Sequence, residues 1–198
     1  NLSKLAANSQ DLRDKLPVTE QKYIGLSTLL KDLVTNASKL TEMLEAVEKA
    51  EEVEGKITAI TIATPTISEA RVAFNALSSI EKRYVQKDAT DLLTSWEKSS
   101  TTATNVVKQI NAISTDVLKS LSDEKIADTR KVSTVSGFVS KVRTAESTYS
   151  KIKPKPASEV TEGTQPTETR EQQLVTNRQR LEQLIPFATI ADDIVKLK

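Results

Sequence analysis

The sequence predicts an all-α protein, an elongated antiparallel helical bundle built from degenerate helical repeats. Apolar residues recur at spacings of three and four, which places them on one face of a helix. Aromatic residues make up only 4% of the 198 residues, so aliphatic side chains must fill the core, as they do in narrow helical bundles. With 4 Gly and 6 Pro, the chain has too few breakers to be dominated by loops or disorder.

Six apolar stripes predict the helices in chain order. The opposite face of each stripe carries Lys, Glu, Asp, Ser and Thr, as expected of a helix with one buried side. The frequent Ser and Thr lower helix propensity, so packing of the stripes must supply most of the stability. The stripes run from Leu2 to Leu16, from Leu26 to Val34, from Leu40 to Val53, from Tyr84 to Trp96, from Val106 to Leu121 and from Val135 to Ile152.

Local signals predict where several helices begin and end. The segments Thr66–Glu69 and Ser78–Glu81 have the form of a capping box, in which a hydroxyl and a Glu satisfy free backbone N–H groups. Gly55 is placed to close the helix that ends near Val53. Prolines are expected at helix boundaries, and three of them are predicted to lie there: Pro17, Pro65 and Pro186.

Two distant segments repeat one pattern. LVTNASKLTEML occupies residues 33–44, and LVTNRQRLEQLI occupies residues 174–185. A second pair aligns without gaps: RVAFNALSSI at 71–80 and RTAESTYSKI at 143–152. The copies are imperfectly spaced, so the sequence predicts degenerate helical repeats and not a regular solenoid.

A Pro-rich segment interrupts the second copy of this pattern. EKRYV follows directly after Ile80, whereas EQQLV follows Ile152 only after a polar stretch with three of the six prolines. Insertions are best tolerated at turns between helices. We therefore expect one helical repeat region at 1–98 and a second at 99–198, with a Pro-rich loop inserted at 153–170.

These segments resemble a helical unit that recurs in large surface proteins of Gram-positive bacteria, including S-layer-like and wall-attached proteins. The resemblance lies at Glu20–Lys22, Leu33–Leu40, Ala70–Val85 and Glu171–Leu181, about a third of the chain. The segment at 70–85 lacks Val-Thr-Asn, and the last copy carries the insertion. The resemblance implies a helical spacer or adhesive segment of an exported protein, and it brings no catalytic residues with it.

Composition excludes several kinds of chemistry. The chain has no Cys and no His, which rules out thiolate nucleophiles, Ser-His-Asp triads and metal sites built on either residue. Lys and Arg number 28 against 27 Asp and Glu, interspersed, so no basic footprint for nucleic acid is expected. No apolar run reaches the length that spans a bilayer. We expect no enzyme activity, no cofactor and no metal.

A few residues are candidates for ligand contact. Trp96 lies near an expected helix end and could offer its ring to a ligand, although core packing explains it as well. Lys151, Lys153 and Lys155 form a small basic cluster that could touch an anionic wall polymer. The run of Glu residues from 45 to 54 is interpreted as a solvated helix face.

The function expected from the sequence is structural. We expect a non-enzymatic spacer or adhesive segment of an exported bacterial surface protein, located outside the cell at the surface or wall. Its partners would be other domains of a larger surface protein, a cell-wall polymer or further copies of itself. A chain that starts at Asn1 without Met fits a processed piece. The alternatives are a module that binds wall polymer or a host ligand, and an intracellular helical scaffold.

Overall fold

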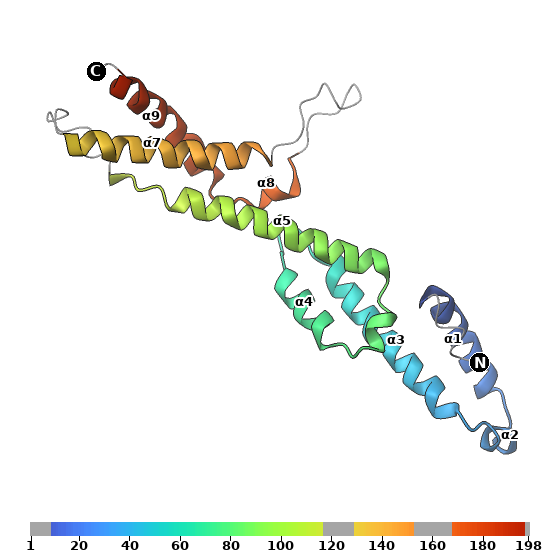
Figure 1. Cartoon of the computed structure of the whole chain (residues 1–198). Coiled ribbons are helices and arrows are strands. Elements are labelled where there is room, and N and C mark those ends of the chain that lie inside the picture. The colour runs from blue at the N-terminus through green and yellow to red at the C-terminus, as the bar shows by residue number, and fades with distance from the viewer. Residues whose placement is uncertain (1–8, 117–128, 153–167, 197–198) are drawn as a thin grey trace, which may run out of the picture. The chain divides into compact units, whose positions relative to one another are not determined.

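The computed structural model describes residues 9–116, 129–152 and 168–196, which form helices joined by turns (Figure 1). No strand occurs in them, and the predicted all-α class is confirmed. The elements are α1 (Ser9–Ile24), α2 (Thr28–Asp32), α3 (Ala37–Thr58), α4 (Ile67–Ala76), the 3-10 helix η2 (Glu81–Arg83), α5 (Lys87–Asn111), α7 (Thr129–Ser150), α8 (Arg170–Leu174) and α9 (Arg178–Lys196).

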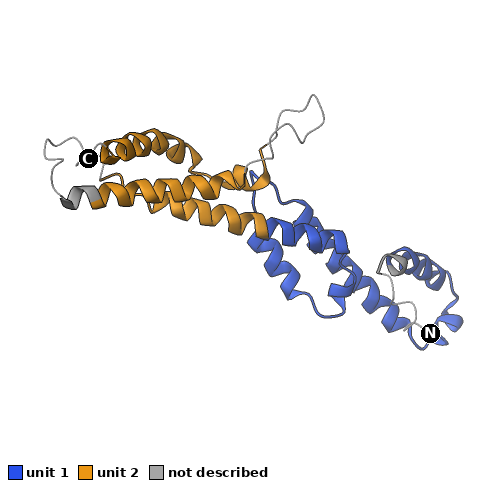
Figure 2. Ribbon diagram, turned by 45° about the horizontal axis from the view of Figure 1, so that its top comes forward, with its two compact units in different colours: residues 1–97 blue, residues 98–198 orange. Residues whose placement is uncertain are grey.

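The chain divides into two compact units, residues 1–97 and 98–198, with the division inside α5 (Figure 2). In the first unit, α3 packs against α1, α4 and η2. Its core is made largely of small and aliphatic side chains along α3 and α4, together with Tyr84, Leu93 and Trp96. This composition agrees with the shortage of aromatic residues in the sequence.

The second unit is organised around the pair of α7 and α9, with the short α8 directly before α9 in the chain (Figure 1). The C-terminal half of α5 contributes to the same core. The buried cluster shared by the three helices and the turn at Val175 consists of Ala103, Val106, Ile110, Ile113, Phe138, Val142, Ala145, Tyr149, Val175, Leu181, Leu184 and Ala188.

Two prolines do not mark helix boundaries as expected. Pro17 lies inside α1 and Pro186 lies inside α9. Proline in a helix interior removes one hydrogen bond and crowds the preceding turn. In α9 the buried Leu184 and Ala188 flank the proline, and their packing holds the helix together across it.

Of three other predicted helix-boundary signals, the structure contradicts two and confirms one. Gly55 does not end α3, which continues to Thr58 because Val53 and Ile57 are both buried on one face. Thr66 makes no side-chain capping bond. The capping box at Ser78 is present: its N–H donates to Glu81 at 2.6 Å, and the Glu81 N–H donates to Ser78 Oγ at 3.2 Å.

Candidate functional site

The predicted contact residues are not brought together as a site. Trp96 lies in the middle of α5 with only 6% of its surface exposed, so its ring is part of the core. Lys151 is exposed just after α7. Lys153 and Lys155 lie outside the described residues. A ring in a ligand platform must present its face to solvent, and that of Trp96 does not.

The acidic run in α3 is mostly a solvated face, with one exception. Glu45, Glu48, Glu51 and Glu52 are exposed. Glu54 instead accepts both terminal nitrogens of Arg13 at 3.0 and 2.9 Å, with side chains only 8% and 16% exposed. No cluster of acidic side chains that could hold a metal ion occurs in the part of the chain that the structure describes.

Three turns of the described chain share one backbone plan. Each begins at a Ser or Thr, passes through a short helix and leads directly into a long helix. We call them turn 1 (27–37), turn 2 (78–87) and turn 3 (169–178), leading into α3, α5 and α9. The first residue of each turn accepts an N–H from four residues ahead: Lys31 to Ser27 at 2.9 Å, Lys82 to Ser78 at 3.0 Å and Gln173 to Thr169 at 3.1 Å.

A second hydrogen bond recurs one turn later in each case. The N–H groups donate to a carbonyl three residues back, and the pairs are Leu33 to Leu30 at 3.2 Å, Tyr84 to Glu81 at 3.0 Å and Val175 to Gln172 at 3.1 Å. Turns 2 and 3 also share a capping box. At turn 3 the Thr169 hydroxyl accepts from the Gln172 N–H, and the Gln172 side chain accepts from the Thr169 N–H.

The ends of two long helices match each other as well. An Ile-x-Ala-Ile segment spans the C-terminal end of both α3 and α5, with the four isoleucines at 57, 60, 110 and 113 all buried. The Ala N–H bonds, Ala59 to Gly55 and Ala112 to Lys108, are both 3.0 Å long. The following Ile N–H bonds are 3.3 and 3.2 Å long. The two helices therefore end with the same local geometry.

The end of α3 contacts turn 2, at what we call junction 2. Glu54 Oε1, one helical turn before the last residue of α3, accepts the N–H of Gln86 at 2.6 Å. Lys49 Nζ donates to Glu81 Oε1 at 2.8 Å. The ammonium of Lys49, followed by the backbone and hydroxyl of Ser78, lowers the pKa of Glu81 from 4.5 to about 2. Since Arg13 also binds Glu54, this junction joins α1, α3 and the start of α5.

The end of α5 contacts turn 3, at what we call junction 3. Asn177 Nδ2 donates to the Val107 carbonyl at 3.1 Å and to Asn111 Oδ1 at 2.9 Å. Arg180 donates to the Ile113 carbonyl at 2.8 Å. The Ile113 carbonyl lies just past the last residue of α5, where carbonyls lack the usual partner four residues ahead in a helix, and Arg180 supplies a donor to it.

One further contact at junction 3 explains a buried polar residue. Ser99, on α5, is buried, and its hydroxyl donates to Glu171 Oε1 at 2.7 Å. This hydrogen bond is the largest of the effects that lower the pKa of Glu171. The bond places the acidic group beside the N-terminal turn of α8, where negative charge is favoured.

Turn 1 has the same backbone plan but a different surface. Its Leu-Val-Thr-Asn segment aligns with that of turn 3, so Leu33 corresponds to Leu174 and Val34 corresponds to the buried Val175. Leu33 is 72% exposed and Val34 is partly exposed, whereas Leu174 packs against the core and Val175 is 2% exposed. At turn 3 the end of α5 belongs to the same buried cluster as Val175. At turn 1 no described helix end takes that place.

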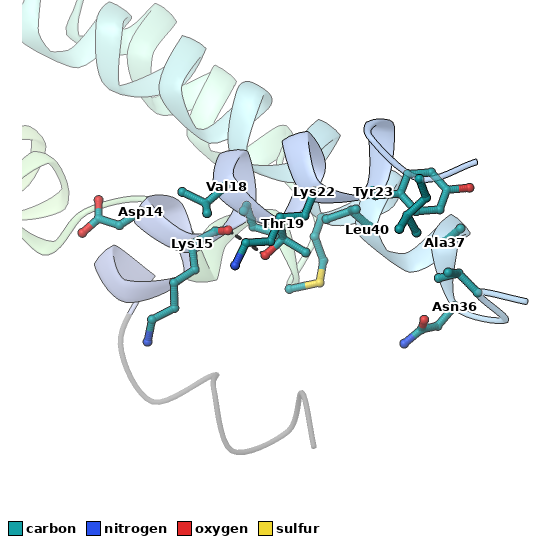
Figure 3. A pocket seen from close by; sticks show the side chains of 13 residues that line it. Asp14, Lys15, Val18, Thr19, Lys22, Tyr23, Asn36, Ala37 and Leu40 are labelled. Carbon is teal, nitrogen blue, oxygen red and sulfur yellow. Dashed lines mark hydrogen bonds between the residues drawn. The ribbon is translucent and has the colours of Figure 1, made fainter. Parts of the chain in front are cut away.

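A groove of about 530 Å³ lies beside turn 1, between α1 and α3 (Figure 3). Its apolar wall is formed by Leu16, Tyr23, Leu26, Leu40 and Met43 and nearby aliphatic residues. Asn36 stands at the end of the groove where α3 begins, and Lys22 and Lys15 reach past its side. Apolar walls with a few polar groups at the edge are typical of a binding groove.

No protein family, characterised protein or solved structure was found to match the chain. Within the ranges that the structure covers, none of the helices combines the length and apolar character needed to cross a bilayer. A proposal for the function therefore has to rest on the geometry of the turns and junctions.

Proposed function

We propose that the chain is a non-enzymatic structural segment made of three copies of one helical repeat. Repeat A comprises α1 to α3, repeat B comprises α4 to α5, and repeat C comprises α7 to α9. Each consists of a helix, a turn of the shared plan and a long helix. The observation that carries the proposal is the pair of junctions, in which the end of one long helix binds the turn of the next repeat.

The junctions give the segment a mechanical role. Junction 2 rests on a largely buried ion pair and a hydrogen bond to backbone, and junction 3 rests on side-chain donors to carbonyls at the end of α5. Such bonds fix the direction of one helix relative to the next, which apolar packing alone specifies less sharply. A chain of repeats held in this way would keep neighbouring domains apart or present a binding face.

The setting that we propose is an exported bacterial surface protein, S-layer-like or wall-attached. It rests on the sequence resemblance at Leu33–Leu40 and Glu171–Leu181, which includes the Asn and the basic residue of the turns. The role of Asn177 and Arg180 at junction 3 supplies a physical reason for those two residue types. An intracellular scaffold would use the same junctions, and an export signal in the complete gene distinguishes the two settings.

The rival proposal, a binding module for wall polymer or a host ligand, has a narrower basis. Its aromatic contact, Trp96, is buried, and its described basic contact is the exposed Lys151. Retention on purified wall material that is lost in Lys151→Glu but kept in Lys141→Glu, an exposed lysine on α7, would favour that module over a spacer.

Stiffness at the junctions tests the structural role directly. The chain has no cysteine, so spin labels can be attached at introduced pairs without background. Glu52→Cys with Asp88→Cys reports on junction 2, and Thr104→Cys with Glu182→Cys reports on junction 3, all at exposed positions. We expect a narrow distance distribution for each pair. Broad distributions at both junctions would contradict a stiff spacer.

A further inference from the structure

We propose that turn 1, with the groove beside it, is a docking site for the C-terminal end of a long helix from a second copy of this chain. The proposal rests on the repeat plan proposed above. Repeats B and C each receive the end of a preceding long helix at their turn. Repeat A has the turn, but no described helix fills that place.

Exposed apolar side chains gather at the two places that this plan leaves open. Ten large hydrophobic residues of the described chain are exposed, and eight of them fall into two groups. The first surrounds turn 1: Val18, Ile24, Leu29, Leu30 and Leu33. The second lies on the third long helix, α9: Phe187, Ile190 and Ile194. Clustering of exposed apolar residues marks interaction surfaces, whereas isolated ones need no explanation.

Turn 1 also carries the polar groups that bind a helix end at junction 3. In the aligned segments Asn36 corresponds to Asn177 and Lys39 corresponds to Arg180. At junction 3 that Asn and that basic residue donate to the carbonyls of Val107 and Ile113. At turn 1 Asn36 makes no capping bond and is exposed, and Lys39 is exposed. An ammonium can donate to a carbonyl as a guanidinium can, so the same kind of helix end fits here.

The C-terminal part of α9 has the properties of the missing helix end. Phe187, Ile190 and Ile194 are spaced by three and four, so they lie on one face of the helix. Asp193 is exposed close to this face, while Lys22 and Lys39 are exposed beside turn 1. Opposite charges on the two surfaces favour this pairing over one between two identical surfaces. The ends of α3 and α5 are occupied at junctions 2 and 3, and α9 follows as the third long helix.

The resulting contact joins the tail of one chain to the head of the next. Such a heterologous contact uses two different surfaces and, unless its rotation closes a ring, builds an open row of copies. One small interface of this kind is expected to be weak for a single chain, with a Kd on the order of 10 µM. In a row of many repeats the same contact would be strengthened by its repetition.

Sedimentation of the whole chain tests the proposal. Wild type should self-associate with rising concentration, and Leu33→Asp should weaken the association at least tenfold, because it puts a charge among the exposed apolar residues of turn 1. Val72→Asp is the matched control, since Val72 is an exposed apolar residue on α4 outside both groups. Equal association of the two variants, or monomers up to about 1 mM for wild type, would overturn the proposal.

Cross-linking identifies the occupant. Because the chain lacks cysteine, Leu33→Cys and Ile190→Cys can be made as single-cysteine proteins and mixed. Disulfides between the two variants should form much faster than those within either variant alone. If the thiol introduced by Leu33→Cys is instead shielded from alkylation in the monomer and released by deleting residues 1–8, the chain's own N-terminal segment is the occupant and the proposal fails.

The docking site and the repeat plan can fail separately. Leu33→Asp should leave the urea midpoint of unfolding unchanged, because Leu33 is exposed in the single chain. Asn177→Ala should lower that midpoint, because Asn177 belongs to junction 3. If Asn177→Ala acts as expected and Leu33→Asp does not affect association, the repeat plan stands and only the docking site is lost.

Discussion

Asn177→Ala and Asn36→Ala form a matched pair that tests whether the junctions hold the repeats together. The two residues occupy the same place in the repeated segment. Asn177 donates two hydrogen bonds to the end of α5, whereas Asn36 is exposed and makes no capping bond. The perturbation is therefore chemically identical, and only the presence of a helix end against the side chain differs.

The expected loss of stability in Asn177→Ala follows from the hydrogen bonds that the substitution removes. Each hydrogen bond of this kind contributes about 1 kcal/mol net, so losing two would cost about 2 kcal/mol. Asn177 Oδ1 is buried without a hydrogen-bond partner among the described residues, and removing it offsets part of that loss. We expect Asn177→Ala to lower the free energy of unfolding by about 1.5 kcal/mol. Asn36→Ala should stay within about 0.5 kcal/mol of wild type, as is usual for exposed positions.

Urea unfolding followed by circular dichroism measures both values. With a urea m-value of about 2 kcal/mol per M, the expected shift in midpoint is about 0.7 M for Asn177→Ala. Amide hydrogen exchange localises the effect, which should appear in residues 107–113 and leave α3 unchanged. If the two variants have the same midpoint, the bonds of Asn177 do not stabilise the junction and the reasoning fails.

Three further changes test the core and the two charged pairs. Ile110 has no exposed surface, so Ile110→Ala should lower the free energy of unfolding by about 3 kcal/mol through the lost side chain and the cavity left behind. A decrease below about 1 kcal/mol in urea unfolding would mean that this core is not packed as described. Glu54→Gln should lower the free energy of unfolding by about 3 kcal/mol, because it leaves the nearly buried Arg13 without its charge partner. Glu52→Gln, at an exposed site of the same helix, should lower it less. Glu81 has a pKa of about 2 in the folded chain against 4.5 in the ordinary state, so its contribution to stability is present above about pH 4.5 and is lost as the pH falls toward 2. The difference in urea midpoint between wild type and Glu81→Gln should therefore shrink over that range, and a constant difference from pH 6 to pH 2.5 would contradict the ion pair.

The helices themselves could be predicted because helix period and burial are both local properties of the sequence. The stripe from Leu40 to Val53 lies on α3 as expected, and the stripe from Val135 lies on α7 as far as Tyr149, with its last member, Ile152, two residues past the helix end. The stripe from Tyr84 to Trp96 does not lie on one helix, because Tyr84 and Val85 precede the start of α5 at Lys87. Both are nevertheless buried, so the apolar pattern predicts burial correctly where it misplaces the helix start.

The residues of the junctions could not be found in the same way. Asn177 and Arg180 bind groups at or just past the end of α5 that lie 66 to 70 positions earlier, and no local pattern encodes such a pairing. Glu54 sits in an acidic run and resembles one more solvated carboxylate, although its position next to the buried Val53 is a signal that it lies at the edge of the core. Trp96 is a candidate ligand contact in the sequence because its expected place near a helix end suggests exposure. Its place in the middle of α5 explains its burial.

The exchange rate of one amide tests most directly whether the end of a long helix binds the turn of the next repeat. The N–H of Gln86 donates to Glu54 at the end of α3, and this bond exists only if the end of a long helix binds the turn of the next repeat. We expect the Gln86 amide to exchange about 10³-fold more slowly than that of Thr35, an exposed residue at the corresponding distance from the start of turn 1. Equal exchange at the two amides, near the rate of an open chain, would show that the end of α3 does not bind turn 2.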